Sequence, residues 1–172
     1  MSNIYSNLNS SEVSETRVRV ESHAKTLDNI VNDIVIPYCR DLDRYVLFVK
    51  DLLKDGERPV TNQELEDICM NLSTQIYFAS GIVENLGIRD DISKALWKEI
   101  YHSTRNSTIT GTVADKDSIA ELASQQEQLT NICYSRAYKI MKAKVDSAQE
   151  LLQSAKKVLS HRMQEMELTK IA

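Results

Sequence analysis

The chain has 172 residues and a formal net charge of −4, and 42% of its residues are hydrophobic. Only four glycines and two prolines are present, too few for the turns of a β-sandwich or for the glycine-rich loops of Rossmann and P-loop folds. The length suits one domain with a sizeable core. Composition therefore favours an all-α protein without a nucleotide-binding loop.

Residues 1–11 are rich in asparagine and serine and are expected to form a disordered arm. Between residues 12 and 36 a helix is predicted, because Leu27, Val31 and Ile34 belong to an apolar set at helical spacing. The alternating residues 17–21 would also suit a strand, but no second strand is evident to pair with it. Pro37 either ends or kinks this helix, or lies in the first turn of the next one.

The next helix carries an apolar face that includes Tyr38, Leu42 and Val49, and a turn follows at residues 54–59, with Gly56 as the C′ residue of the helix. Thr61 and Glu64 match a capping box. This box predicts the start of a helix that Gly87 ends, with a shorter helix beginning at Asp90 or Asp91. We therefore expect an N-terminal helical bundle over residues 12–104.

The C-terminal part is expected to consist of a polar loop at 105–117 and one long helix at 118–168. Ser118 and Glu121 match a second capping box, and neither glycine nor proline follows up to residue 168. Such a helix is about 75 Å long, whereas a compact domain of this size is only about 40 Å across. The fold class is therefore all-α, an elongated helical bundle with a long C-terminal helix.

A helix that overhangs its own domain exposes part of its apolar stripe, and such a stripe is usually covered by another chain. We therefore predict a homo-oligomer built on the C-terminal helix. The residues assigned to this contact are Ile140, Leu151, Leu152, Ala155, Val158 and Leu159.

Basic residues are concentrated late in the chain, with seven basic and two acidic residues between positions 136 and 162. Basic side chains neutralise phosphates, and aromatic rings stack on unpaired bases. Two clusters combine both kinds of residue, and their members are candidate nucleic-acid contacts: Lys94, Trp97, Lys98, Tyr101 and Arg105 in one, and Arg136, Lys139, Lys142 and Lys144 in the other. The same charges are equally compatible with a solvated helix face. Tyr134 and Tyr138, beside the second cluster, suit either stacking or the core.

Catalysis finds little support in the sequence. Asp115 and Asp117, with Glu121, are the candidates for a divalent-cation site, but acids at this position usually cap a helix. No nucleophile motif is recognisable, and the histidines lack metal-ligand partners at helical spacing. We therefore expect no catalytic residue, no metal and no cofactor, and a helical metal-dependent enzyme is the least favoured class.

The cellular setting is also constrained. Cys39, Cys69 and Cys133 form an odd, widely spaced set, typical of a reducing compartment. Residues 1–11 lack the basic start of a signal peptide, and the longest uncharged apolar run, residues 34–39, is far too short to cross a bilayer. We expect a cytoplasmic protein with no membrane partner.

The Ala-Asp-Lys-Asp motif at 114–117 and the helix that follows it to Met163 resemble the UvsY-type recombination mediators of tailed bacteriophages. The resemblance covers about a third of the chain and leaves residues 1–90 without a counterpart. It implies a ring-like helical homo-oligomer in the host cytoplasm that binds single-stranded DNA, displaces single-strand binding protein and loads a RecA-like recombinase. The family carries basic residues before a Tyr-Tyr-rich stretch. Here Lys98, Tyr101 and Arg105 fall nearest that place, with His102 at the second tyrosine position and the preceding lysine absent.

A second hypothesis is a helical structural or adaptor protein, such as a virion component or an assembly chaperone. In that case the C-terminal helix would contact other proteins through its apolar stripe. The mediator depends on its cations, whereas the adaptor depends on its apolar residues and should not bind nucleic acid.

Overall fold

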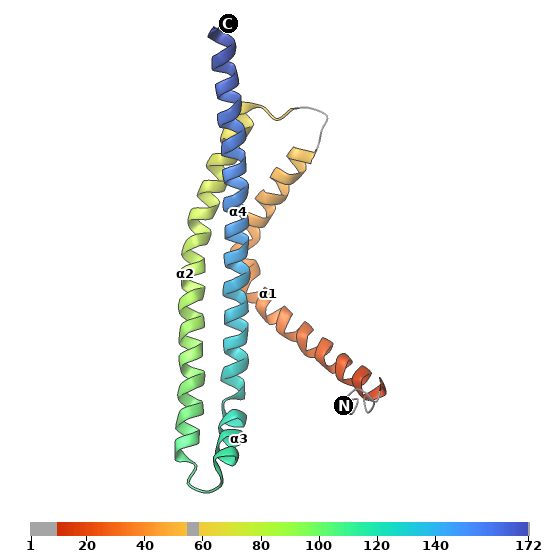
Figure 1. Ribbon diagram of the computed structural model, residues 1–172, viewed down its shortest axis with the longest axis vertical. Coiled ribbons are helices and arrows are strands. Elements are labelled where there is room, and N and C mark those ends of the chain that lie inside the picture. Colours follow the sequence, from red (N-terminus) through yellow and green to blue (C-terminus); the bar gives the residue numbers. More distant parts are fainter. Residues whose placement is uncertain (1–9, 55–58, 172) are drawn as a thin grey trace, which may run out of the picture.

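The computed structural model describes residues 10–54 and 59–171 (Figure 1). Four helices account for nearly all of this part of the chain: α1 (Ser10–Lys54), α2 (Asn62–Ser107), α3 (Val113–Ala123) and α4 (Gln125–Ile171). The described residues contain no strand. The predicted all-α class, an elongated bundle with a long C-terminal helix, is confirmed.

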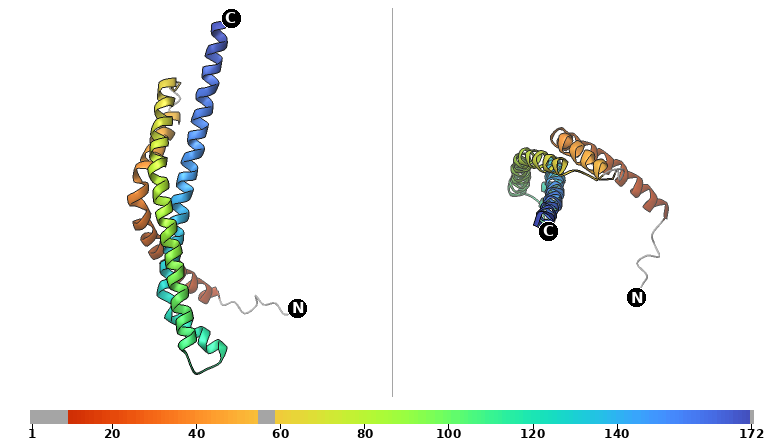
Figure 2. Two further views of the ribbon diagram at one scale, coloured as in Figure 1. Left: turned by 90° about the vertical axis from the view of Figure 1, so that its left-hand side faces the viewer. Right: turned by 90° about the horizontal axis from the view of Figure 1, so that it is seen from above.

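Helices α2 and α4 lie side by side in opposite directions over most of their length (Figures 1 and 2). Near the α3 end, the side-chain amide of Asn131 donates a 3.0 Å hydrogen bond to the Ser93 hydroxyl. Near the other end, the Arg162 guanidinium donates to the carbonyl oxygen of Val60. These two contacts fix the register of the hairpin.

A single core runs between α1, α2 and α4, each of which contributes one apolar face. The helical spacing of these residues turns them to one side of each helix. Its most deeply buried members are Val35 and Val49 from α1, Leu72 and Leu86 from α2, and Met141 from α4. Small residues on α4, including the fully buried Ala137, let it lie close to its neighbours.

Pro37 lies inside α1 rather than at a boundary, so the two helices expected on either side of it form one. A proline in a helix interior removes a backbone hydrogen bond and obstructs the preceding turn. The two halves of α1 accordingly run in different directions (Figure 1). The C-terminal half packs on the hairpin, whereas residues 12–26 are exposed throughout.

The prediction that Gly87 ends a helix is wrong, because α2 continues through it and through Asp90 and Asp91 to Ser107. A Cβ atom at Gly87 would lie 3.4 Å from Cε2 of Tyr138 on α4. The glycine thus allows close packing of two helices instead of ending one. The capping box of Thr61 and Glu64 is confirmed at the start of α2.

The helix expected over residues 118–168 begins later, at Gln125, and a separate short helix, α3, precedes it. The capping box here joins Thr112 and Asp115, so the box predicted at Ser118 and Glu121 is wrong. The two helices are separated at Ser124, which has φ −101° and ψ 8° and donates a 2.8 Å hydrogen bond to the carbonyl of Ala120. The polar loop shrinks to residues 108–112, where Gly111 has a φ of 105°.

Two other expectations concern residues outside the described part. Positions 1–9 of the expected arm lie there, whereas Ser10 and Ser11 belong to α1. The turn residue Gly56 also lies outside the described residues.

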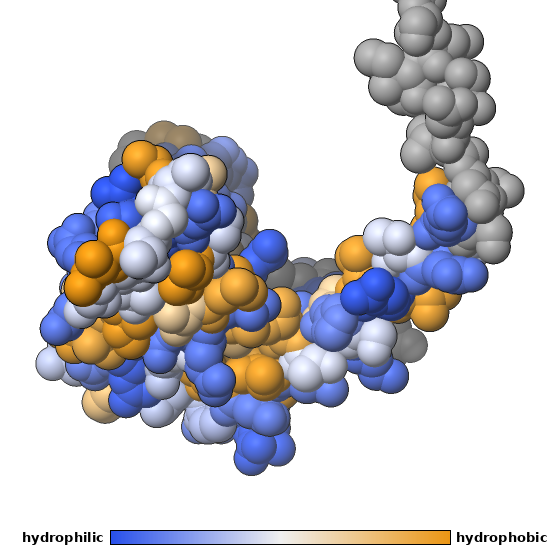
Figure 3. Space-filling model, turned by 90° about the horizontal axis from the view of Figure 1, so that it is seen from below, coloured by the Kyte–Doolittle hydropathy of each residue, from blue (hydrophilic) through white to orange (hydrophobic). Residues whose placement is uncertain are grey.

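The molecule is elongated and exposes 12,957 Å² of surface. A compact monomer of this mass exposes about 8,600 Å². The excess includes apolar side chains around the α2–α3 end, such as Ile109, Val113 and Leu122 (Figure 3). Across residues 10–54 and 59–171, no helix combines the length and the apolar character that crossing a bilayer requires.

Candidate nucleic-acid interface

Asp117 on α3 contacts two residues at the end of α2, and this contact is called the α2–α3 joint below. Its carboxylate accepts a hydrogen bond from the Arg105 guanidinium and another, at 3.3 Å, from the Tyr101 hydroxyl. The Arg105 hydrogen bond lowers the pKa of Asp117 below the ordinary carboxyl value. Desolvation and the Asp117 charge raise the pKa of the Tyr101 phenol. Arg105 and Tyr101, both predicted DNA contacts, are thus engaged within the chain.

Asp115, the other acid of the motif, does not share a site with Asp117. Its carboxylate accepts hydrogen bonds from the backbone N–H and the hydroxyl of Thr112, at 2.9 and 2.8 Å, and these bonds lower its pKa. The described residues contain no group of three or more His, Cys, Asp or Glu side chains able to hold a metal ion. The capping interpretation therefore accounts for Asp115, and an ion pair accounts for Asp117.

A cavity of about 520 Å³ opens beside this joint, between α2, α3 and the start of α4. Three of the predicted contact residues line it, namely Trp97, Lys98 and Tyr101, and His102 lies next to them. The rings of Tyr101 and His102 meet edge to face, with centroids 5.3 Å apart. Trp97 is half-buried. Aromatic rings with a neighbouring cation in a concave site are the features that bind an unpaired base.

The far wall of this cavity was not predicted from the sequence as part of a nucleic-acid site, although one of its residues, Glu121, was a candidate metal ligand. It is formed by Glu121, Ser124 and Gln128. These residues come together only because the chain turns at Ser124, and no glycine or proline marks that turn. Glu121 places one negative charge on the rim of an otherwise basic and aromatic site.

Five of the predicted cations are exposed: Lys94, Lys98, Arg136, Lys139 and Lys142. No ion pair is found for any of them among the described residues. The hydrogen bond between Asn131 and Ser93 puts Lys94 level with the second turn of α4. With a rise of 1.5 Å per residue, the five cations are spread over about 24 Å along the hairpin axis.

Lys144, another of the predicted cations, is differently placed. Its ammonium contacts both carboxylate oxygens of Asp43 on α1 at 2.7 Å. The pair ties α1 to α4, so Lys144 has a structural partner within the chain.

Tyr138 packs against the core, and Tyr134 lines a groove between α1 and α4. The core interpretation therefore holds for Tyr138.

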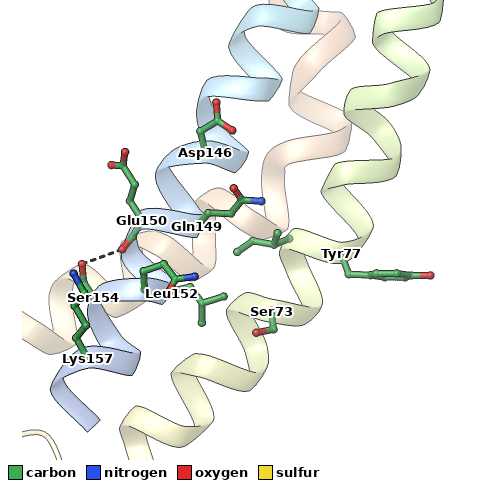
Figure 4. A pocket seen from close by; sticks show the side chains of 10 residues that line it. Ser73, Tyr77, Asp146, Gln149, Glu150, Leu152, Ser154 and Lys157 are labelled. Carbon is green, nitrogen blue, oxygen red and sulfur yellow. Dashed lines mark hydrogen bonds between the residues drawn. The ribbon is translucent and has the colours of Figure 1, made fainter. Parts of the chain in front are cut away.

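Acidic side chains interrupt the basic residues further along α4. A groove between α2 and α4 is lined there by Asp146, Glu150 and Lys157 from α4 and by Ser73 and Ile76 from α2 (Figure 4). Two carboxylates at this point repel phosphates. This acidic stretch therefore separates the exposed cations nearer α3 from Lys156 and Lys157 further along α4.

The residues predicted for oligomer contacts do not share one surface. Leu152 and Ala155 are buried within the chain, and Leu151 and Leu159 are half-buried. Ile140 and Val158 are exposed. Of the six residues, these last two leave the most surface for contact with another chain, at 37% and 45% exposure.

Comparison with protein-family models, with curated proteins and with solved structures finds no match to this chain. The resemblance to recombination mediators therefore rests on residues 114–163 alone.

Proposed function

We propose that this chain is a non-enzymatic, single-stranded-DNA-binding protein of the recombination-mediator type. The observation that carries the proposal is the cavity at the α2–α3 joint, where Trp97, Tyr101 and Lys98 lie beside a group of exposed cations. The resemblance at residues 114–163 adds the expected biological role. In that role the protein displaces single-strand binding protein and helps a RecA-like recombinase onto DNA.

In this proposal the cations contact phosphates and the cavity holds a base. Lys139 and Lys142 on α4, with Lys94 on α2, neutralise the backbone, and Trp97 provides the stacking surface. Each cation that neutralises a phosphate releases counterions, so the affinity falls as salt rises. One copy offers few such contacts, and strong binding then requires several copies on one strand.

The single tryptophan makes the test direct, because Trp97 is the only residue of its kind in the chain. An oligothymidylate is titrated at about 50 and 300 mM salt, and Trp97 fluorescence and oligonucleotide anisotropy are followed together. The proposal expects quenching of Trp97 that parallels the anisotropy change, weaker binding at high salt, and weak binding to duplex. Absence of binding at low salt would contradict it.

The cations are tested by charge reversal. Lys139→Glu with Lys142→Glu should lower the salt dependence of binding, since about 0.7 is lost from the slope of log affinity against log salt for each phosphate contact removed. The control is Lys156→Glu with Lys157→Glu, which reverses the same number of charges on the same helix, beyond Asp146 and Glu150. It should leave the slope unchanged. If the two double variants changed the slope equally, the assignment of Lys139 and Lys142 as phosphate contacts would be wrong.

A second candidate function is a helical adaptor, favoured by the large exposed surface and its apolar content. In this case the chain binds other proteins and gives no fluorescence change with DNA. The same titration therefore separates the two candidates.

A further inference from the structure

Helix α2 has two apolar faces, and only one of them is covered. The inner face, which includes Leu65, Ile68 and Leu72, is buried against the rest of the chain. The outer face is exposed and consists, with Gly81 at its centre, of Met70, Tyr77, Phe78, Ile88, Ile92 and Leu96. Tyr77 and Phe78 are 75% and 65% exposed, and Tyr77 points away from α4 (Figure 4).

The outer face is a regular pattern rather than a set of scattered residues. Met70, Tyr77, Gly81, Ile88 and Ile92 follow one another at steps of seven, four, seven and four residues. Such steps keep side chains on one side of a helix. A helix that is apolar on two opposite sides is typical of one that lies between two partners. In this structure other helices of the chain pack on the inner side of α2 and leave its outer side exposed.

Gly81 is the second observation. It lies in the middle of a 46-residue helix, where glycine is less favourable than alanine because it loses more backbone freedom. Nothing within the chain requires it, since a Cβ atom at this position would meet no atom within 4 Å. Gly87 differs, because Tyr138 lies against it. A glycine on an outer apolar face lets the backbone of a second helix approach closely.

We propose that the outer face of α2 binds the same face of a second copy of this chain, with the two helices antiparallel and crossing at Gly81. A two-fold axis there places Met70 opposite Ile92 and Thr74 opposite Ile88, and each pairing occurs twice. Met70 and Ile92 thus form an apolar pair on each side of the crossing, and Tyr77 of one copy lies opposite Asn85 of the other. The proposal does not depend on DNA binding and holds for a mediator or an adaptor.

Charge favours the antiparallel arrangement. Residues 62–88 contain four acidic side chains and no basic one, whereas residues 89–107 contain four basic and three acidic side chains. Antiparallel pairing sets the acidic part of one helix beside the more basic part of the other. Parallel pairing would set two acidic parts together, which is unfavourable.

The area is adequate for a stable contact. The six large side chains of the outer face together expose on the order of 700 Å², close to the roughly 800 Å² that each partner buries in a standard interface. Most of this area comes from Tyr77, Phe78 and Met70, which flank the crossing on one side.

The mass of the full chain in solution, without DNA, tests the proposal. Sedimentation equilibrium at about 1–100 µM should give at least twice the 19.6 kDa of one chain. Tyr77→Lys with Phe78→Lys should lower the mass by a factor of two. Leu47→Lys with Phe48→Lys is the matched control, because these neighbours on α1 are also exposed, at 55% and 56%. The control should keep the wild-type mass.

Gly81→Gln separates loss of contact from loss of folding. Glutamine is a better helix former than glycine, and the position is open in the single chain, so the variant should be at least as helical as wild type by circular dichroism. It should nevertheless raise the dissociation constant of the dimer more than tenfold. A wild-type monomer over the whole concentration range, or a Gly81→Gln variant with the wild-type mass, would overturn the proposal.

Cysteine cross-linking tests the orientation, in a background with Cys39, Cys69 and Cys133 replaced by alanine. Gly81→Cys should form an interchain disulfide with its own counterpart, because a two-fold axis brings the two Cα atoms within about 7 Å. Tyr77→Cys should cross-link to Asn85→Cys in a mixture of the two variants and not to itself. Self-linking of Tyr77→Cys without the mixed product would indicate parallel helices and would contradict the proposed arrangement.

Discussion

At the scale of single residues, Asp117 holds the α2–α3 joint through its charge. Its pKa is lowered in the folded protein by the Arg105 hydrogen bond, so the unfolded chain binds a proton more readily than the folded one. This contribution is therefore fully present above the unfolded carboxyl pKa of about 4 and is lost as pH falls through the lower folded value.

Replacing the Asp117 carboxylate should lower the free energy of unfolding at pH 7. At pH 3 the loss should be much smaller. Urea unfolding of Asp117→Asn and of wild type is compared at pH 7 and pH 3. We expect the variant to be less stable at pH 7, with a smaller difference at pH 3, because the unfolded wild-type carboxyl binds a proton there that folding must release. Asp91→Asn on α2 is a control, since no ion pair of Asp91 is found among the described residues. An Asp117→Asn difference of the same size at both pH values would contradict the electrostatic explanation.

Gly81 and Gly87 are only six residues apart, but they should respond differently to alanine. Gly81→Ala should stabilise the single chain by about 0.5–1 kcal/mol, because alanine is the better helix former and the added methyl group meets nothing. Gly87→Ala should gain less, because its Cβ would press on the ring of Tyr138. Urea unfolding at a concentration where the chain is monomeric measures both. Equal gains would mean that the contact with Tyr138 is unimportant.

At the scale of elements, the two faces of α2 should differ sharply in their sensitivity to truncation. Leu72 is fully buried and Met70 is 71% exposed. Leu72→Ala should cost about 2–5 kcal/mol of unfolding free energy, because it removes apolar contacts and leaves a cavity. Met70→Ala should change the stability of the monomer by less than about 0.5 kcal/mol. Thermal or urea unfolding of the two variants checks this, and a large loss for Met70→Ala would place that residue in the core.

The helical spacing of apolar residues predicted most of the helices. Residues that pack in the core must lie on one side of a helix, and this requirement fixes their spacing in the sequence. Val31, Leu42 and Val49 are examples in which pattern and burial agree. The errors concern boundaries. Gly87 resembles a terminator locally, but α2 stays helical through it where it packs on Tyr138, and at Pro37 the structure follows the alternative of a kink within one helix (Figure 1). Local sequence cannot report this, because the compensating contacts come from distant residues.

The candidate site was predicted in part for the same reason. Trp97, Lys98 and Tyr101 are near one another on α2, so their helical spacing already predicts a cluster. The side of the cavity formed by Ser124 and Gln128 depends on a helix break that no turn residue marks. Lys144 and Arg105 look like free cations in the sequence, and only the fold shows their partners, Asp43 and Asp117.

At the scale of the whole molecule, the two halves of α1 should differ in stability although they form one helix. Val31, Val35 and Val49 anchor the C-terminal half in the core. None of residues 12–26 is buried, so this segment relies on its own backbone hydrogen bonds. An isolated helix of about 15 residues is marginal in water, and Pro37 interrupts the hydrogen-bond pattern that would otherwise link it to the anchored half.

Amide hydrogen exchange followed by mass spectrometry should therefore divide α1. In dilute protein, peptides from residues 12–26 should exchange almost as fast as an unfolded chain, and peptides from residues 31–49 should be protected like those of α2. Deleting the chain up to residue 24 should shift the melting midpoint by less than about 2 °C, because residues 12–24 are all exposed. Strong protection of residues 12–26 that grows with protein concentration would show instead that another copy covers this segment. The outer face of α2 would then not be the only surface through which the chain associates.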